Sequence, residues 1–270
     1  MSLEIVAREG LVLLGCGKMG SALLAGWLKA GLPASSFWVI EPNPSDWLQA
    51  TGVHLNEGVP PAPGVAVLAV KPQMMGAALP ALQALGNGRT LFLSIAAGTT
   101  IAAFEEVLGN RTPLVRAMPN TPAMVGRGIT GICANATAGA AGLALGQALM
   151  EAVGQVVILD GEHQIDAVTA LSGGGPAYVF HLIEAMAQAG VAQGLSEEVA
   201  MQLARATVCG AGELAYRSPE SAAQLRINVT SPGGTTAEGL KVLMNPDSGF
   251  PALLTRAVQA AADRGRELGK

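Results

Sequence analysis

The sequence predicts an α/β N-terminal domain, with a doubly wound parallel sheet, followed by an all-α C-terminal domain. Three observations support this prediction. Short apolar runs alternate with helical segments over the first half, a glycine-rich turn follows the first run, and no strand pattern is evident after Ile165. We therefore expect two domains, residues 1–160 and residues 161–270.

The composition is typical of a globular protein that hides part of its surface. Half of the 270 residues are hydrophobic and only 13% are charged, which predicts self-association. The net charge of −4 argues against a dedicated nucleic-acid binder. Three scattered cysteines, Cys16, Cys133 and Cys209, favour neither a disulfide framework nor a metal site. They indicate a reducing, cytoplasmic environment.

A membrane location is the alternative explanation for so few charges. The uncharged stretch 128–150 is long enough to span a bilayer. Its polar residues and glycines favour a buried strand followed by a helix of small residues instead. The N-terminus shows no leader-peptide pattern, so we expect neither a membrane segment nor a leader.

The first element is a buried strand at residues 11–14, which leads into the glycine turn 15–20. A helix over residues 21–30 and a second strand at residues 37–40 follow, and Glu41 ends that strand. Strand, G-x-G-x-x-G turn, helix, strand and acidic residue together form the dinucleotide-binding fingerprint of a Rossmann-like domain.

Each glycine of the turn has a physical role in this fingerprint. Gly15 permits the tight turn, Gly17 lets the backbone approach a pyrophosphate, and Gly20 lets the helix pack close to the strand. The free N–H groups and the positive end of the helix dipole then face the phosphates. The turn therefore predicts dinucleotide binding.

Glu41 stands where a carboxylate would accept hydrogen bonds from the adenosine ribose and repel a 2′-phosphate. This placement favours NADH. Residues 42–45, which include Asn43, could instead form a loop that reaches a phosphate through neutral groups. The sequence therefore leaves the choice between NADH and NADPH open.

Further strands are expected at residues 65–70, 91–95 and 113–116. In doubly wound sheets the ligand lies beyond the carboxyl ends of the strands. Lys71, Ala97 and Asn120 lie just beyond these three ends. We expect them along the ligand-binding edge.

The second half has the pattern of an all-helical domain. Helices are expected at residues 165–171, 177–192, 196–217, 218–225 and 251–268. Their surfaces carry few charges and many small residues, which favours a helical dimer interface.

The loop 228–238 precedes a further expected helix over residues 236–244. Thr235 and Glu238 have the spacing of a capping box. Exposed N–H groups at the helix start would bind a small carboxylate, although an ordinary capped helix explains the same pattern.

The chain as a whole resembles the pyrroline-5-carboxylate reductase family. The similar segments are residues 15–20, 69–72, 94–98, 116–123, 166–169, 175–178 and 231–236. Two departures are visible. Gly174 replaces a serine usual in the family, and Arg226 and Ile227 replace the Lys-Asp pair that often precedes the asparagine found here as Asn228.

The resemblance implies a dinucleotide-binding domain and a helical dimerisation domain that interleaves with that of a partner chain. It implies hydride transfer from NADPH or NADH to the imine carbon of 1-pyrroline-5-carboxylate, which gives L-proline in the last step of proline biosynthesis. It also implies a homodimer, with larger assemblies of dimers, and an active site between the cofactor of one chain and helical residues at the dimer interface.

The resemblance also implies which residues bind each ligand. The cofactor residues are Gly15, Cys16, Gly17, Lys18, Met19, Asn56, Val70, Lys71, Pro72, Ala96, Ala97 and Asn120, to which the fingerprint adds Glu41 and Asn43. The substrate residues are Glu162, Asn228, Ser231, Gly233, Gly234, Thr235 and Thr236. Thr236 and Ser231 are the expected catalytic residues, and Thr236 would hold the ring nitrogen by a hydrogen bond.

Two other functions remain open at this point. A hydroxyacid dehydrogenase of the same two-domain plan commonly uses a lysine of the second domain, but no lysine occurs between Lys71 and Lys241. A dinucleotide-binding regulatory dimer without turnover is harder to exclude. The intact loop 231–236 counts against it.

Overall fold

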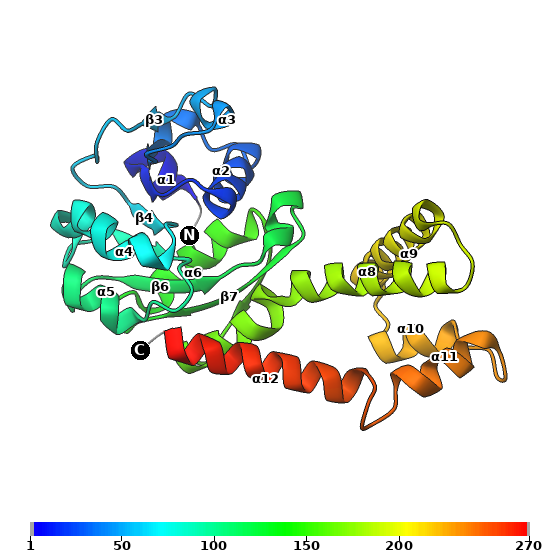
Figure 1. The fold of residues 1–270 in the computed structure, drawn as a ribbon. Coiled ribbons are helices and arrows are strands. Elements are labelled where there is room, and N and C mark those ends of the chain that lie inside the picture. Colours follow the sequence, from blue (N-terminus) through cyan, green and yellow to red (C-terminus); the bar gives the residue numbers. More distant parts are fainter. Residues whose placement is uncertain (1–2, 269–270) are drawn as a thin grey trace. The chain divides into compact units, whose positions relative to one another are not determined.

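The computed structural model describes residues 3–268, which form two compact units (Figure 1). The first unit extends to Gly173 and includes the end of the last helix from Ala261 onward. The second unit comprises Gly174–Ala260. The predicted domains of residues 1–160 and 161–270 stay a prediction.

An eight-stranded sheet forms the centre of the first unit, in the order β3-β2-β1-β4-β5-β6-β7-β8. Its strands are β1 (Leu11–Leu14), β2 (Phe37–Ile40), β3 (His54–Leu55), β4 (Val65–Leu68), β5 (Leu91–Ser94), β6 (Leu114–Met118), β7 (Gly128–Ala134) and β8 (Gly154–Ile158). All neighbours are parallel except β6 and β7, which are antiparallel. The prediction of a doubly wound, mainly parallel sheet is confirmed. The chain order reverses between β1 and β4, which is where such sheets bind ligands.

Helices pack against both faces of this sheet. They are α1 (Glu4–Glu9), α2 (Lys18–Lys29), α3 (Asp46–Gln49), α4 (Pro72–Ala78), α5 (Ile101–Leu108), α6 (Gly139–Glu151) and α7 (Ile165–Val168). The side chains of a strand alternate between faces. Leu13 therefore joins the core under α2 and α6, while Leu14 joins the core under α4 and α5. Trp27 ties the first layer together, because its Nε1 donates to the Leu149 carbonyl at 2.8 Å.

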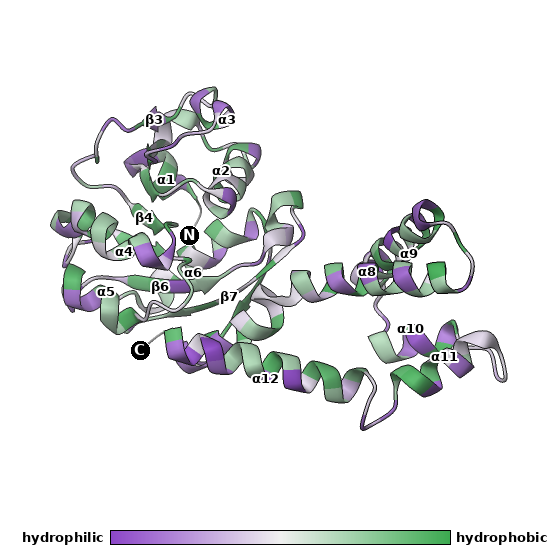
Figure 2. Cartoon of the chain, viewed as in Figure 1, coloured by the Kyte–Doolittle hydropathy of each residue, from purple (hydrophilic) through white to green (hydrophobic). Residues whose placement is uncertain are grey.

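The second unit is helical and has very little core of its own. It contains α8 (Gly175–Ala192), α9 (Glu197–Arg217), α10 (Ala222–Asn228), α11 (Thr235–Leu243) and the first part of α12 (Phe250–Leu268). Its buried cluster among the described residues consists of Ala187, Ala200 and Ala204. Hydrophobic and hydrophilic residues are interspersed along α8, α9 and α12 (Figure 2).

Two helix starts differ from the sequence prediction by three residues or more. The helix α2 begins at Lys18 rather than at residue 21, because Gly17 rather than a later residue is its N-cap. The helix expected over residues 218–225 begins only at Ala222. The reason is that Ser221 is the better cap: its Oγ accepts a hydrogen bond from the Gln224 N–H at 3.2 Å.

The uncharged stretch 128–150 forms β7 and most of α6, which confirms the expected strand and helix. Within residues 3–268, no helix has the length and apolar character that crossing a bilayer requires.

Candidate active site

The glycine turn between β1 and α2 has the geometry that the fingerprint predicts. Gly15 has a φ of +90°, and a Cβ there would lie 2.8 Å from the Val70 backbone nitrogen. A Cβ on Gly20 would lie 2.5 Å from the Gly15 carbonyl oxygen, so a side chain at either position would collide with backbone. Around a Cβ on Gly17 there is open space to 4 Å. The turn is therefore tightly packed against the protein at Gly15 and Gly20, and it leaves free space beside Gly17.

A cavity of about 740 Å³ lies at the carboxyl ends of the strands, beside this turn. Predicted cofactor residues on its wall are Gly17, Lys18, Met19, Val70, Lys71, Pro72, Ala96, Ala97 and Asn120. The wall also contains Ala69, Ile95, Met118, Pro119, Thr121 and Gly173, which are not among the predicted cofactor residues. Most of these residues are direct sequence neighbours of predicted ones. Including one more residue on each side of the predicted positions would have identified them. The volume is in the range of small-molecule sites.

The start of α2 supplies hydrogen-bond donors beside this cavity. Its N-cap, Gly17, has no side chain to cap the first helical N–H groups. Such groups and the helix dipole attract anions, and Lys18 adds a positive charge at the first helical position. This part of the turn fits a pyrophosphate.

Cys16 lies within the turn, where its thiol is buried. The side chain is buried, and its Sγ lies 3.5 Å from the Ser21 Oγ. Burial raises the pKa of the Cys16 thiol above its ordinary value, and this effect exceeds the lowering by the Ser21 hydrogen bond; the negative charge of Glu41 adds a smaller upward shift. The neutral thiol packs in the turn.

Glu41, Asn43 and Asn56 form a hydrogen-bonded group at the end of β2, outside the cavity wall. One carboxylate oxygen of Glu41 accepts from the Cys16 N–H at 2.8 Å, and the other accepts from the Asn43 N–H at 3.0 Å. The Asn56 side chain holds the Glu41 backbone from the other side. It accepts from the Glu41 N–H and donates to the Glu41 carbonyl, both at 2.9 Å.

Asn120 connects three segments at the opposite wall of the cavity. It is 9% exposed. Its Oδ1 accepts from the Ile129 N–H at 3.0 Å, and its Nδ2 donates to the Ser172 Oγ at 3.3 Å. Ser172 belongs to the π-helical turn Thr169–Gly173 that follows α7. The amide of Asn120 therefore fixes the end of β6 relative to β7 and to this turn.

Glu162 lies in the first unit, where its carboxylate is bound by protein groups. Its Oε1 accepts from the Arg116 Nη1 at 2.7 Å and from the Ile101 N–H at 2.7 Å. The Arg116 side chain is only 5% exposed, and its Nε has no hydrogen-bond partner among the described residues. Glu162 is the ion-pair partner of this buried cation. Its expected contact with the substrate remains a prediction.

The other predicted substrate residues lie in the second unit, from the last residue of α10 to the first turn of α11. Asn228 ends α10, and its side chain bonds to Glu220 and Gln224. Gly233 has a φ of +69°, which favours glycine there. Gly234 follows, and its N–H donates to the Ser231 carbonyl at 3.0 Å. The two glycines thus turn the chain sharply into α11.

The expected capping box at the start of α11 is wrong. The helix spans Thr235–Leu243, and its N-cap is Gly234, which has no side chain to accept a hydrogen bond. Glu238 pairs with Lys241 at 2.6 Å instead of reaching back. Since no side chain caps the helix, the first N–H groups of α11 are available to an external acceptor. The backbone N–H groups that would form the expected anion site are thus exposed because the helix has no side-chain cap, and a capping box plays no part.

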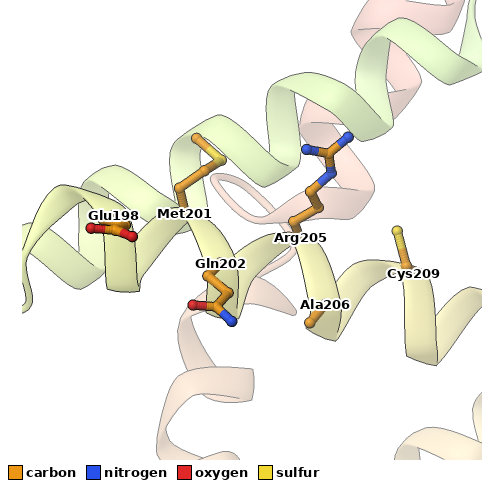
Figure 3. A pocket seen from close by; sticks show the side chains of 6 residues that line it. All are labelled: Glu198, Met201, Gln202, Arg205, Ala206 and Cys209. Carbon is orange, nitrogen blue, oxygen red and sulfur yellow. The ribbon is translucent and has the colours of Figure 1, made fainter.

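A groove of about 540 Å³ lies along α9 in the second unit (Figure 3). Its lining residues are Glu198, Met201, Gln202, Arg205, Ala206 and Cys209. None of the predicted site residues borders it. Within residues 3–268, no group of three or more metal-ligating side chains is present.

Comparisons with known proteins identify close relatives. Residues 162–268 match the family model for pyrroline-5-carboxylate reductase dimerisation, and residues 11–98 match the model for coenzyme F420-dependent NADP oxidoreductases. A pyrroline-5-carboxylate reductase of Pseudomonas aeruginosa is 40% identical, covering 96% of this chain and 97% of the relative. One from Synechocystis is 41% identical, covering 96% and 98%.

Solved structures agree with these sequence matches. A pyrroline-5-carboxylate reductase from Coxiella burnetii superposes with a TM-score of 0.90 at 36% identity, covering 97% of this chain and 99% of the other. The Plasmodium falciparum enzyme, solved with NADP bound, has a TM-score of 0.83 at 30% identity, covering 98% and 99%.

Proposed function

Because the chain belongs to the pyrroline-5-carboxylate reductase family, we propose that it reduces 1-pyrroline-5-carboxylate to L-proline with NADH or NADPH. The observation that carries this proposal is the glycine turn beside the cavity at the strand ends. The relative solved with NADP supports a nicotinamide dinucleotide as the cofactor. The bound reduced nicotinamide supplies the hydride for the imine carbon.

The cofactor is held by three parts of the first unit. The N–H groups at the start of α2, with Lys18, bind the pyrophosphate. Backbone after β4 and β5, at Val70 and Ala97, lines the cavity where the dinucleotide lies. Asn120 positions the cavity wall that faces them, since its amide is fixed by Ile129 and Ser172.

The substrate carboxylate binds the uncapped start of α11. An anion there receives hydrogen bonds from the N–H groups of the first turn and is favoured by the helix dipole. The left-handed Gly233 and the compact Gly234 leave this backbone accessible. The site therefore needs no arginine, and the chain has none between Arg226 and Arg256.

Thr236 lies on the first turn of α11 and is exposed in the chain. We assign its hydroxyl to a hydrogen bond with the ring nitrogen of the imine, and Ser231 to the same site. A threonine is a poor acid, so Thr236 holds the nitrogen while a proton is delivered, with water as the source.

Replacing Thr236 with alanine is expected to lower turnover about tenfold or more while cofactor affinity is kept, because one hydrogen bond worth ~1–3 kcal/mol is lost. Steady-state kinetics with the imine and a fluorescence titration of the nicotinamide measure the two effects. Thr236→Ser retains the hydroxyl and should keep most of the activity. Unchanged turnover in Thr236→Ala would remove this hydroxyl from the mechanism.

The chain acts as a homodimer in this proposal, and dimers associate further. The second unit buries only a few alanines, while Phe180 and Leu203 are 60% and 53% exposed. Surfaces of this kind are typical of subunit interfaces. The dimerisation model that matches residues 162–268 supports the homodimer. The groove along α9 (Figure 3) is part of this uncovered surface.

The compartment proposed for the enzyme is the cytoplasm. Its cysteines are free thiols, two of them buried and one exposed. Free thiols are usual in a reducing compartment.

The proposed activity is tested by mixing the protein with the imine and each nicotinamide in turn, and following absorbance at the reduced nicotinamide band. The expected result is oxidation of the reduced nicotinamide that depends on the imine, with L-proline as the product. Oxidation with a 2-oxo acid but not with the imine would favour a hydroxyacid dehydrogenase, and binding without oxidation would favour a regulatory dimer.

A further inference from the structure

We propose that Glu41 makes this enzyme prefer NADH to NADPH, because its carboxylate is fixed where the 2′-phosphate of NADPH would have to lie. This inference rests on the proposed function and specifies the cofactor of the same site. Family membership alone does not predict this preference, since one matching model describes NADP oxidoreductases and one relative was solved with NADP.

The carboxylate of Glu41 is held toward the glycine turn. It accepts the Cys16 N–H at 2.8 Å with one oxygen and the Asn43 N–H at 3.0 Å with the other. Turning it away would leave two backbone donors without partners. Each carboxylate oxygen has a second lone pair, so the same group can still accept hydrogen bonds from the two ribose hydroxyls of NADH.

The backbone of Glu41 is fixed as well. The Asn56 amide bonds to both its N–H and its carbonyl at 2.9 Å. Asn56 is itself held in place, because its N–H donates to the Val39 carbonyl at 2.8 Å. Its φ of +56° is a left-handed conformation that asparagine tolerates better than most residues. The carboxylate is therefore fixed from both sides.

The loop after Glu41 offers few groups for a phosphate. Pro42 and Pro44 have no N–H. The Asn43 N–H is already donated to Glu41, and the Ser45 Oγ accepts from the Leu48 N–H at 3.3 Å as the cap of α3. The loop backbone therefore offers no N–H at Pro42 or Pro44 and has its Asn43 N–H committed to Glu41, while the Ser45 hydroxyl is held as the helix cap.

The segment around Glu41 supplies no positive side chain. The sequence has no lysine or arginine between Lys29 and Lys71. Lys71 follows β4, which is separated from β2 by β1. The acidic neighbours in the sequence, Asp46 and Glu57, add negative charge, and His54 is paired with Glu57 at 2.9 Å. A 2′-phosphate at the end of β2 would therefore face the Glu41 carboxylate, and residues 30–70 supply no cation to offset that charge.

The test is the ratio of kcat/KM for NADH to kcat/KM for NADPH, measured with saturating imine. We expect the unmodified enzyme to favour NADH by at least about tenfold, as two like charges a few ångströms apart repel measurably near a protein surface. Glu41→Ser should lower this ratio at least about tenfold, mainly by improving the use of NADPH. Glu41→Gln, which keeps the shape and removes the charge, should lower it in the same direction.

Glu106→Gln is the matched control, because it removes one exposed carboxylate from α5 and should leave the ratio unchanged. A wild-type enzyme that uses NADPH as well as or better than NADH would overturn the inference, and so would a ratio that both Glu41 variants leave unchanged. Either result leaves the proposed reduction intact, whereas activity with neither cofactor contradicts the proposed function itself.

Discussion

Replacing Gly20 with valine is expected to weaken NADH binding at least about a hundredfold and to lower stability by about 1–3 kcal/mol. The cause is a direct collision, because even a Cβ at this position would lie 2.5 Å from the Gly15 carbonyl oxygen. To relieve it, α2 must move away from the turn, and the N–H groups that face the pyrophosphate move with it. Titration of the nicotinamide fluorescence and thermal unfolding measure the two effects.

Gly17→Ala is the informative companion of this variant. A Cβ on Gly17 has open space around it, and the residue has a φ of −69°, which any amino acid adopts. We therefore expect normal stability but weaker cofactor binding, because the new methyl group points to the space that the pyrophosphate needs. Normal NADH binding by both variants would show that the dinucleotide does not use this turn.

Replacing Glu162 with alanine is expected to lower the free energy of unfolding by about 3–5 kcal/mol. The loss follows from its partner, because the guanidinium of Arg116 is 5% exposed and loses its counter-ion. The Ile101 N–H at the start of α5 loses its acceptor at the same time. Urea unfolding followed by circular dichroism gives the change directly.

The double variant Arg116→Met with Glu162→Leu separates two costs of removing Glu162. One is the unpaired charge of Arg116, and the other is the lost acceptor of the Ile101 N–H. With both charges removed, the buried cation is gone, and most of the lost stability should return. If the free energy of unfolding of Glu162→Ala lies within about 1 kcal/mol of that of the unmodified protein, the ion pair does not stabilise the fold. A higher KM for the imine in a folded Glu162 variant would support the expected contact with the substrate.

The strands at the centre of the sheet were predictable because each is a continuous apolar run. The four residues of β1, for example, are buried on both faces. The strand β8 was missed because it lies at the edge of the sheet, where Gln155, Val157 and Ile158 are exposed and its pattern is not that of a buried strand. The antiparallel pairing of β6 with β7 could not be predicted either, since strand direction depends on how the chain returns.

In the candidate site, features set by neighbouring residues in the sequence were predictable, and contacts between distant residues were not. The turn at Gly15 and Gly20 was predictable, because the roles of these glycines follow from residues next to them in sequence. The partners of Glu41 and Glu162 were not predictable, since Cys16 and Arg116 lie 25 and 46 residues away. At α11 the Thr235–Glu238 spacing was misleading, because the preceding glycines start the helix one residue earlier.

Transfer of deuterium from nicotinamide labelled at its C4 position is the most direct test of the account. The protein is incubated with 1-pyrroline-5-carboxylate and reduced cofactor carrying deuterium on either face of that carbon, and the proline formed is examined by mass spectrometry and NMR. We expect one deuterium on the ring carbon that was the imine carbon, from one face only. Proline without label from either cofactor, or no proline at all, would contradict hydride transfer at this site.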